Sequence, residues 1–225
     1  MGNDARMTLA AKAPDERRRR ILAAAIVVLR ERGFSGTRVA DIAATAGTSP
    51  ALVLYHFSSL ADVLVAALGS IEDDYYAELA THAADDPRDR LALMGSLNAE
   101  VGPAFGDWQL WLEVWVRGLH DERIDQLRRV SDQRWRQAIR DVIDAGVEQG
   151  QFRVEDPDGA TLRIASLQDG LAVQAVLGGA DLTPESMSRE WLIGVAHELG
   201  IDPADLSARM RLDEKSPSVV SADGT

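Results

Sequence analysis

Three tryptophans, Trp108, Trp111 and Trp115, recur at spacings of three and four residues, which places them on one face of a helix. Indole rings attract cations to their electron-rich faces and also line cavities for flat hydrophobic molecules. Asp169 lies among apolar residues at helical spacing, where an acid needs a protein arginine or a ligand cation as its partner. These four residues predict an effector-binding cavity. The alternative interpretation of the tryptophans is ordinary core packing.

Arrangements of residues that perform catalysis are absent from the sequence. The four histidines, His56, His82, His120 and His197, lie in separate segments without metal-ligand spacing. There is no cysteine nucleophile, Gly-rich phosphate loop or Gly-x-Ser-x-Gly motif. We therefore expect neither catalytic activity nor a bound metal or cofactor.

The charge of the 225-residue chain is unevenly distributed. The total of −12 argues at first against a partner as negative as DNA. Residues 1–57, however, hold nine basic and five acidic side chains, whereas the remainder holds 15 basic and 31 acidic ones. The first part is therefore +4 and the second −16, which indicates a DNA-binding segment on an acidic body. The alternative is that Arg17–Arg20 is only a solvated helix start.

Three further features of the sequence bear on the location of the protein. The absence of cysteine suits a reducing cytosol. The longest purely apolar run, Ile21 to Leu29, is shorter than the roughly 20 residues that cross a bilayer. The first 14 residues lack the apolar segment of a signal peptide. We expect a cytoplasmic protein without a membrane partner.

Helical periodicity predicts an all-α fold with two domains and a tail. We expect a helix-turn-helix domain at 15–60, a larger helical domain at 61–212, and a disordered tail at 213–225. Only Gln151–Val154 alternates like a strand. The expected helical segments are 15–33, 38–46, 50–56, 60–81, 87–101, 107–119, 122–149, 158–177 and 185–199.

The first three helices have clear start and stop signals. Thr37 is the expected N-cap of the second helix, and Ser49 followed by Pro50 begins the third. Gly33 and Gly47 end the first and second helices. This order of helices with a tight turn is that of a helix-turn-helix. We expect its two short helices to pack on the first through Ile42, Ala46, Val53 and Phe57.

This segment resembles the TetR/AcrR family of repressors over about 45 residues. The motifs that carry the resemblance are Arg20-Ile21-Leu22, Gly33-Phe34, Ile42-Ala43, Ala46-Gly47-Thr48-Ser49 and Tyr55-His56-Phe57. The remaining chain is similar in length and helical layout, so the resemblance implies a DNA-binding domain at 15–60 and an effector-binding and dimerisation domain at 61–212. Within it, the Trp-x-Glu-x-Trp stretch 111–115 and the long helix that follows resemble the betaine- and choline-responsive branch.

The resemblance implies two kinds of DNA contact. The expected base contacts come from Ser49, Pro50, Ala51 and Leu52, whose mainly apolar side chains suit thymine methyl groups. The expected phosphate contacts come from Thr37, Arg38, Thr48, Tyr55 and His56, with Arg17 and Arg20 of the basic run. Leu60 and Ala40 stand where the family often has basic residues, and we expect the basic run to replace that attraction. The alternative for His56 is a surface residue that caps its helix.

The segment 158–177 is apolar on two opposite sides. Leu162, Ala165, Val173 and Val176 fall on one side, and Ile164, Leu167 and Leu171 on the other. Such a helix is buried on both sides, by its own core and by a partner. Trp191 and Val195 of the next helix would join a four-helix interface between two copies. The alternative is a central helix wholly inside one subunit.

These features together predict a ligand-responsive repressor that binds a palindromic operator as a homodimer. We expect a small-molecule effector, cationic or flat and hydrophobic, to shift helix 60–81 and so change the spacing of the two recognition helices. Glu113 and Arg117, four residues apart, are expected to form an ordinary surface pair. The alternative function is a helical protein-interaction module with a vestigial DNA-binding motif, which only Leu60 supports.

Overall fold

The computed structural model describes residues 4–81, 85–100, 106–178 and 182–209, and within these ranges it contains helices and no strand. The predicted tail, 213–225, and His82 lie outside the described residues. The helices are α1 (Asp4–Gly36), α2 (Val39–Thr45), α3 (Pro50–His56), α4 (Leu60–Thr81), α5 (Pro87–Glu100), α6 (Gly106–Gly118), α7 (Glu122–Glu148), α8 (Pro157–Leu177), α9 (Pro184–Leu199) and α10 (Pro203–Arg209). The all-α prediction is confirmed.

The helices α4 to α9 begin and end within one residue of the predicted positions because their signals are strong. The Asp156 and Thr183 side chains accept from backbone N–H groups at the starts of α8 and α9, and each of these helices has proline at its first turn. Helix α10 and the extension of α1 to Asp4 were not predicted. The strand-like segment Gln151–Val154 is a connection, and its Phe152 packs against Gly146 of α7.

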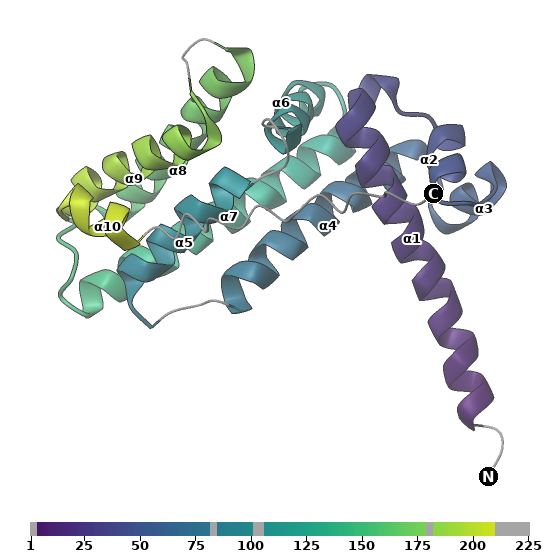
Figure 1. Cartoon of the computed structure of the whole chain (residues 1–225), viewed down its shortest axis with the longest axis horizontal. Coiled ribbons are helices and arrows are strands. Elements are labelled where there is room, and N and C mark those ends of the chain that lie inside the picture. Colours follow the sequence, from purple (N-terminus) through teal and green to yellow (C-terminus); the bar gives the residue numbers. More distant parts are fainter. Residues whose placement is uncertain (1–3, 82–84, 101–105, 179–181, 210–225) are drawn as a thin grey trace, which may run out of the picture.

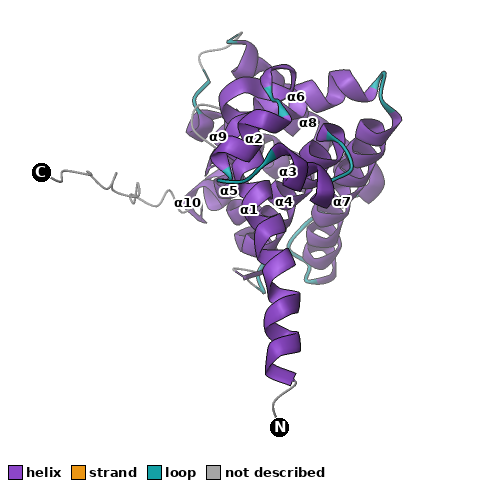
Figure 2. Ribbon diagram, turned by 90° about the vertical axis from the view of Figure 1, so that its right-hand side faces the viewer, coloured by secondary structure: helices purple, strands orange, loops and turns teal. Residues whose placement is uncertain are grey.

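The helices α1, α2 and α3 lie at one end of the molecule and α8, α9 and α10 at the other, with α4 and α7 running between them (Figure 1). The N-terminal part of α1 extends away from all other helices (Figure 2). This arrangement separates a small three-helix head from a larger body. Helix α4 is part of both.

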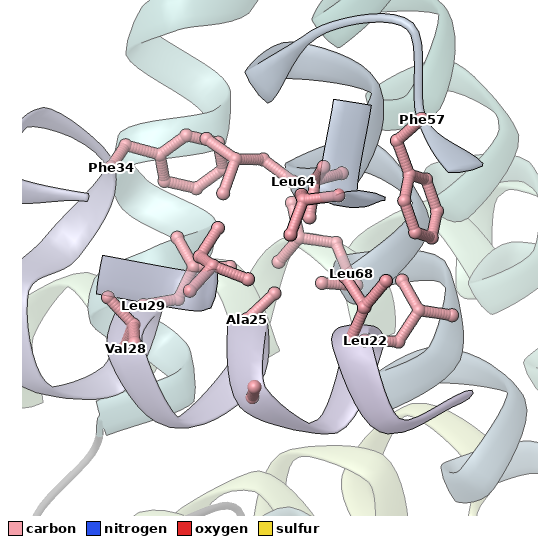
Figure 3. Close-up of a cluster of buried hydrophobic side chains, with 14 of the residues drawn as sticks. Leu22, Ala25, Val28, Leu29, Phe34, Phe57, Leu64 and Leu68 are labelled. Carbon is pink, nitrogen blue, oxygen red and sulfur yellow. The ribbon is translucent and has the colours of Figure 1, made fainter. Parts of the chain in front are cut away.

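The head is held by one apolar core, shown in Figure 3. Helix α1 contributes Leu22, Ala25 and Leu29, which pack against Leu64 and Leu68 at the start of α4. The predicted packing of the two short helices is confirmed, because their anchors are at most 5% exposed; these are Ile42, Ala46, Val53 and Phe57. Leu110 and Val114 of α6 belong to the same core, so the head also packs on the body.

Membrane-spanning potential is confined to one bent pair among the described residues. No single helix there is both long and apolar enough to cross a bilayer. Helices α3 and α4 satisfy the length and hydropathy criteria only when taken together, and they are bent by 67° against each other.

Candidate DNA-binding face and effector cavity

Helix α3 presents its first turn and one long face to solvent. The Ser49 hydroxyl accepts from the Leu52 N–H at 3.2 Å and fixes the start of the helix. Ser49, Pro50 and Ala51 are exposed, whereas Leu52 is half-buried. Tyr55 is 81% exposed and meets the His56 ring edge-on at 5.3 Å. The expected base-contacting residues therefore lie on one accessible surface.

Cationic side chains flank this surface. Arg17, Arg20 and Arg38 are exposed and have no ion-pair partner among the described residues. Arg18 of the same run lies over the Phe57 ring at 4.9 Å, which ties the start of the run to the end of α3. Thr48, just before α3, and His56, at its end, are half-buried. Free guanidinium groups at these positions suit phosphate oxygens.

The prediction that Thr37 contacts phosphate and caps α2 is wrong. Thr37 is only 3% exposed, and its hydroxyl donates to the Gly33 carbonyl oxygen at 2.7 Å. Gly33 has φ of 64° and ψ of 179°, so the helical hydrogen bonding of α1 is interrupted there and that carbonyl needs a donor. Arg38 occupies the N-cap position of α2 and forms no side-chain cap.

The body contains a cavity of about 120 Å³ between α4, α5, α6, α7 and α8. It is lined by Trp108, Trp111 and Trp115 of α6 and by Asp169 of α8, so the structure brings these four predicted residues together. Trp135 of α7 adds a fourth tryptophan to the wall. The tryptophans are half-buried, so they line the cavity and also pack against neighbouring core residues.

Two tyrosines of α4 complete the aromatic wall. The Tyr75 ring meets the rings of Tyr76 and Trp135 edge-on, at 5.2 and 6.3 Å. Trp135 also packs on Trp191 of α9 at 6.1 Å, so the wall continues into the core of the body. Burial raises the pKa of both tyrosines, which keeps their hydroxyls neutral.

The cavity is electrostatically negative. Its lining includes the carboxyl groups of Glu72, Asp132 and Asp169 and, among the described residues, no basic side chain. Asp169 as a whole residue is exposed, yet desolvation of its carboxyl group and the charge of Asp132 raise its pKa to about 6, with Arg136 opposing them. Burial raises the pKa of Glu72. Carboxylates that bear raised pKa values favour a ligand cation as counter-charge.

A buried polar pair closes the side of the cavity nearest α5. The Asn98 amide donates to the Gln168 side-chain oxygen at 3.3 Å, and both residues are almost fully buried. Gln168 is the neighbour of Asp169 on α8, so this bond fixes the helix that carries the carboxylate. Buried side-chain amides are found in an apolar wall when they hydrogen-bond to a partner, as these two do to each other.

Residues that the sequence reasoning missed come from α4 and α7. Tyr75, Tyr76 and Glu72 share a face because they are three and four residues apart, and Asp132 and Trp135 are likewise three apart. An acidic residue followed three or four residues later by an aromatic one occurs in both helices, and this repeated pattern could have predicted these cavity residues. Which pairs converge depends on helix packing, which the spacing does not reveal.

The predicted dimer residues fall into two groups. Leu162 is 54% exposed and Val173 and Val176 are half-buried on α8, so they remain available for a partner. Ala165, Trp191 and Val195 are buried within the single chain, and their assignment to the interface is therefore wrong. The Trp191 indole N–H donates to the Ile164 carbonyl at 3.2 Å, which joins α9 to α8 beneath the exposed face.

Polar contacts join the head to the cavity wall at α6. Arg30 of α1 forms an ion pair with Asp107, the neighbour of Trp108. Glu113 accepts from the Phe34 N–H at 3.1 Å, and Arg117 donates to the Ser35 hydroxyl at 2.5 Å. Glu113 and Arg117 form the predicted pair, with the Arg117 Nε atom 3.8 Å from a Glu113 carboxylate oxygen, and both side chains also bind the end of α1.

Known proteins match both parts of the chain. Residues 21–67 match the model of bacterial regulatory proteins of the tetR family, and residues 87–199 match the C-terminal domain of BetI-type transcriptional repressors. A curated relative, the HTH-type transcriptional regulator BetI of Stenotrophomonas maltophilia, is 27% identical over 177 residues, or 77% of this chain and 88% of that protein. The BetI of Paraburkholderia phymatum is 27% identical over 200 residues, or 87% of this chain and 88% of that protein.

Solved structures show the same likeness. A putative transcriptional regulator from Saccharomonospora viridis, in complex with choline, is 32% identical with a TM-score of 0.74, covering 82% of this chain and 98% of that one. A putative TetR-family regulator from Rhodococcus sp. is 26% identical with a TM-score of 0.71, covering 82% of this chain and 99% of that one.

A helix-turn-helix head on a helical body with a cavity defines the class of ligand-responsive, DNA-binding transcriptional repressors. The chain belongs to the TetR family, and its C-terminal domain is of the BetI type. The predicted family, branch and regulatory function are confirmed. This family consists of transcriptional regulators, not enzymes.

Proposed function

We propose that the chain represses transcription as a homodimer on a palindromic operator and releases it when a quaternary ammonium compound of the choline type fills the cavity. The observation that carries this proposal is the lining itself: four tryptophans, two tyrosines and three carboxyl groups without a basic residue among the described ones. The choline bound to the Saccharomonospora viridis regulator supports the same ligand class.

The chemistry of the wall favours a quaternary ammonium group over a primary amine. A trimethylammonium group has no N–H to donate, so its charge is best met by the faces of aromatic rings. Desolvated indole rings contribute up to about 2 kcal/mol to such a contact. Asp169 and Asp132 then supply the counter-charge at longer range. A neutral lipophile would leave Asp169 without that compensation, whereas Asp132 is already paired with Arg128 at 2.6 Å.

On the DNA side, we assign base contacts to Ser49, Pro50, Ala51 and Leu52 and phosphate contacts to Arg17, Arg20, Arg38, Thr48, Tyr55 and His56. Their support is exposure on the face of the head that α3 presents. Two copies would place α3 in successive major grooves, about 34–36 Å apart. The DNA-binding domain then spans 15–60 and the effector-binding and dimerisation domain 61–212.

Two helices can transmit occupancy of the cavity to the head. Helix α4 lines the cavity with Tyr75 and Tyr76 and packs in the core of the head through Leu64 and Leu68. Helix α6 carries three cavity tryptophans and the contacts to α1. A ligand that spreads the aromatic wall would move both helices and change the separation of the two α3 helices. Such coupling amounts to about 1–3 kcal/mol.

The proposal is tested by fluorescence anisotropy with a duplex from upstream of the gene, at low and moderate salt. We expect saturating choline to weaken operator binding about 5–150-fold. Its neutral carbon analogue, 3,3-dimethyl-1-butanol, has the same shape and should have little effect. Equal release by both compounds would contradict a cation site. Failure to bind the duplex at either salt concentration would instead support the protein-interaction alternative.

A further inference from the structure

Two ion pairs join α4 to α7 in the same register. The Arg123 Nη1 atom donates to the Asp62 Oδ1 atom at 3.3 Å, and the Arg134 Nη1 atom donates to the Asp73 Oδ1 atom at 2.8 Å. The partners are 61 residues apart in both pairs, so the helices run side by side in the same direction (Figure 1). The first pair is close to the head, because α4 begins at Leu60. The second is about three helical turns further along, at the level of the cavity.

Arg134 also touches the wall of the cavity, which distinguishes it from Arg123. Its guanidinium carbon lies 3.9 Å from the centroid of the Tyr76 ring. Tyr76 and Glu72 both line the cavity, whereas Arg134 is not among the lining residues. Burial raises the pKa of Glu72, and the positive charge of Arg134 opposes that shift. Arg134 therefore acts on an aromatic ring and a carboxyl group of the wall from outside the cavity.

A cation inside the cavity would be attracted by the same two groups. A quaternary ammonium group there would lie near the Tyr76 ring and the Glu72 carboxylate. Two cations that share one ring and one carboxylate repel each other, so each weakens the other's attraction to the wall. A neutral molecule of the same shape fills the cavity without this repulsion. The charge of the ligand, and not its shape, then decides whether the contact between Arg134 and α4 weakens.

We propose that Arg134 is an internal cation that ties α4 to α7 in the operator-binding state, and that an effector cation in the cavity loosens this tie by repulsion. The tie is a property of the ligand-free chain, whereas its loosening by choline rests on the proposed function. Arg134 is therefore a positioning residue for α4, the helix shared by the cavity and the head. Both Arg134 and Asp73 are partly exposed to water, so the expected effects are several-fold and not larger.

Operator binding without ligand tests the tie. We expect Arg134→Gln to weaken operator binding about two- to fivefold in fluorescence anisotropy, because α4 is no longer held against α7 at the cavity. Arg134→Lys keeps a cation that can reach Asp73 and should retain most of the affinity. An operator affinity of Arg134→Gln equal to that of the parent would overturn the tie.

The ratio of the affinities for choline and for neutral 3,3-dimethyl-1-butanol, measured by calorimetry, tests the repulsion. A general loosening of α4 changes both affinities alike, whereas repulsion acts on choline alone. We expect Arg134→Gln to shift the ratio about two- to fivefold toward choline. Asp73→Asn breaks the same ion pair but leaves the cation on the Tyr76 ring, so it should not shift the ratio toward choline. The same shift in both variants, or none in Arg134→Gln, would overturn the repulsion.

Arg123→Gln is the matched control for the ligand measurements. It removes the other ion pair of the two helices, whose residues do not line the cavity, and should leave the ratio unchanged. In the anisotropy assay, the factor by which choline weakens operator binding should fall about twofold or more in Arg134→Gln, since the tie is already lost. An undiminished factor would contradict the proposal. If the parent does not bind choline, the proposed effector is wrong, while the ligand-free operator affinities still decide whether Arg134 ties α4 to α7.

Discussion

Arg30 and Asp107 form a bidentate ion pair between the head and the effector domain. The Arg30 Nε and Nη2 atoms donate to the Asp107 Oδ1 and Oδ2 atoms at 2.6 and 2.7 Å. Asp107 is buried, whereas Arg30 is partly exposed. Because Asp107 precedes Trp108, the helix that anchors α1 is also the helix that carries the cavity tryptophans. A shift of this helix therefore acts directly on the DNA-binding head.

Arg30→Ala should be more harmful than Asp107→Ala. The first substitution leaves a buried carboxylate unpaired, whereas the second frees a guanidinium that can reach water. We expect Arg30→Ala to lower the free energy of unfolding by about 2–3 kcal/mol in urea denaturation. The double variant should recover part of this loss. Arg129→Ala is the control, since Asp125 keeps Arg128 as its partner there; equal losses in all variants would refute a special role for the pair.

Trp115 should contribute to choline affinity mainly through the electron-rich face of its aromatic ring, and less by filling space. We expect Trp115→Leu to weaken choline binding by about 0.5–2 kcal/mol, or roughly 2–30-fold, in calorimetry. Trp115→Phe, which keeps an aromatic face, should lose less. Binding of 3,3-dimethyl-1-butanol should not follow this order. If Leu and Phe weaken binding equally, the tryptophan serves only to fill space.

Choline affinity should fall as the pH is lowered through 6. The pKa of Asp169 is about 6 because its surroundings penalise the charged form, so the carboxylate that attracts the cation is lost below that pH. We expect about tenfold weaker binding at pH 5 than at pH 8, measured by calorimetry. Asp169→Asn should be weak and nearly independent of pH in this window. A wild-type affinity that does not change with pH would contradict a direct role for the carboxylate.

Arg38 should bind phosphate without reading sequence. Its side chain is exposed at the start of α2 and has no ion-pair partner among the described residues. We expect Arg38→Ala to weaken binding to the operator and to a random duplex by similar factors. The slope of log K against log salt should decrease by about 0.9, since one counterion fewer is released. Arg129→Ala in the body is the matched control. An unchanged slope would remove Arg38 from the contacts.

The sequence predicted most of the fold because its local signals agree with one another. Ser49, Pro50 and Gly47 mark the turn and the third helix through their own backbone preferences, which do not depend on distant residues. Trp108, Trp111 and Trp115 share one helix, so their spacing alone placed them together. Tyr75 and Trp135 come from two other helices, and only packing brings them to the same wall. Thr37 was misassigned because its hydroxyl donates to the Gly33 carbonyl, which has no helical hydrogen-bond donor after the kink at Gly33.

Gly33→Ala should disturb the junction between the head and α6. Gly33 has φ of 64°, which L side chains rarely adopt, and a Cβ there would collide with the Glu113 Oε1 atom. That carboxylate holds the Phe34 N–H, so the substitution adds strain and also displaces an anchor of the head. We expect a loss of about 1–3 kcal/mol in the free energy of unfolding and weaker operator release by choline. Gly69→Ala inside α4 meets no atom within 4 Å and should instead stabilise the protein by about 0.5–1 kcal/mol. If Gly33→Ala is as stable as the wild type, the end of α1 relaxes freely and the junction does not hold the head in place.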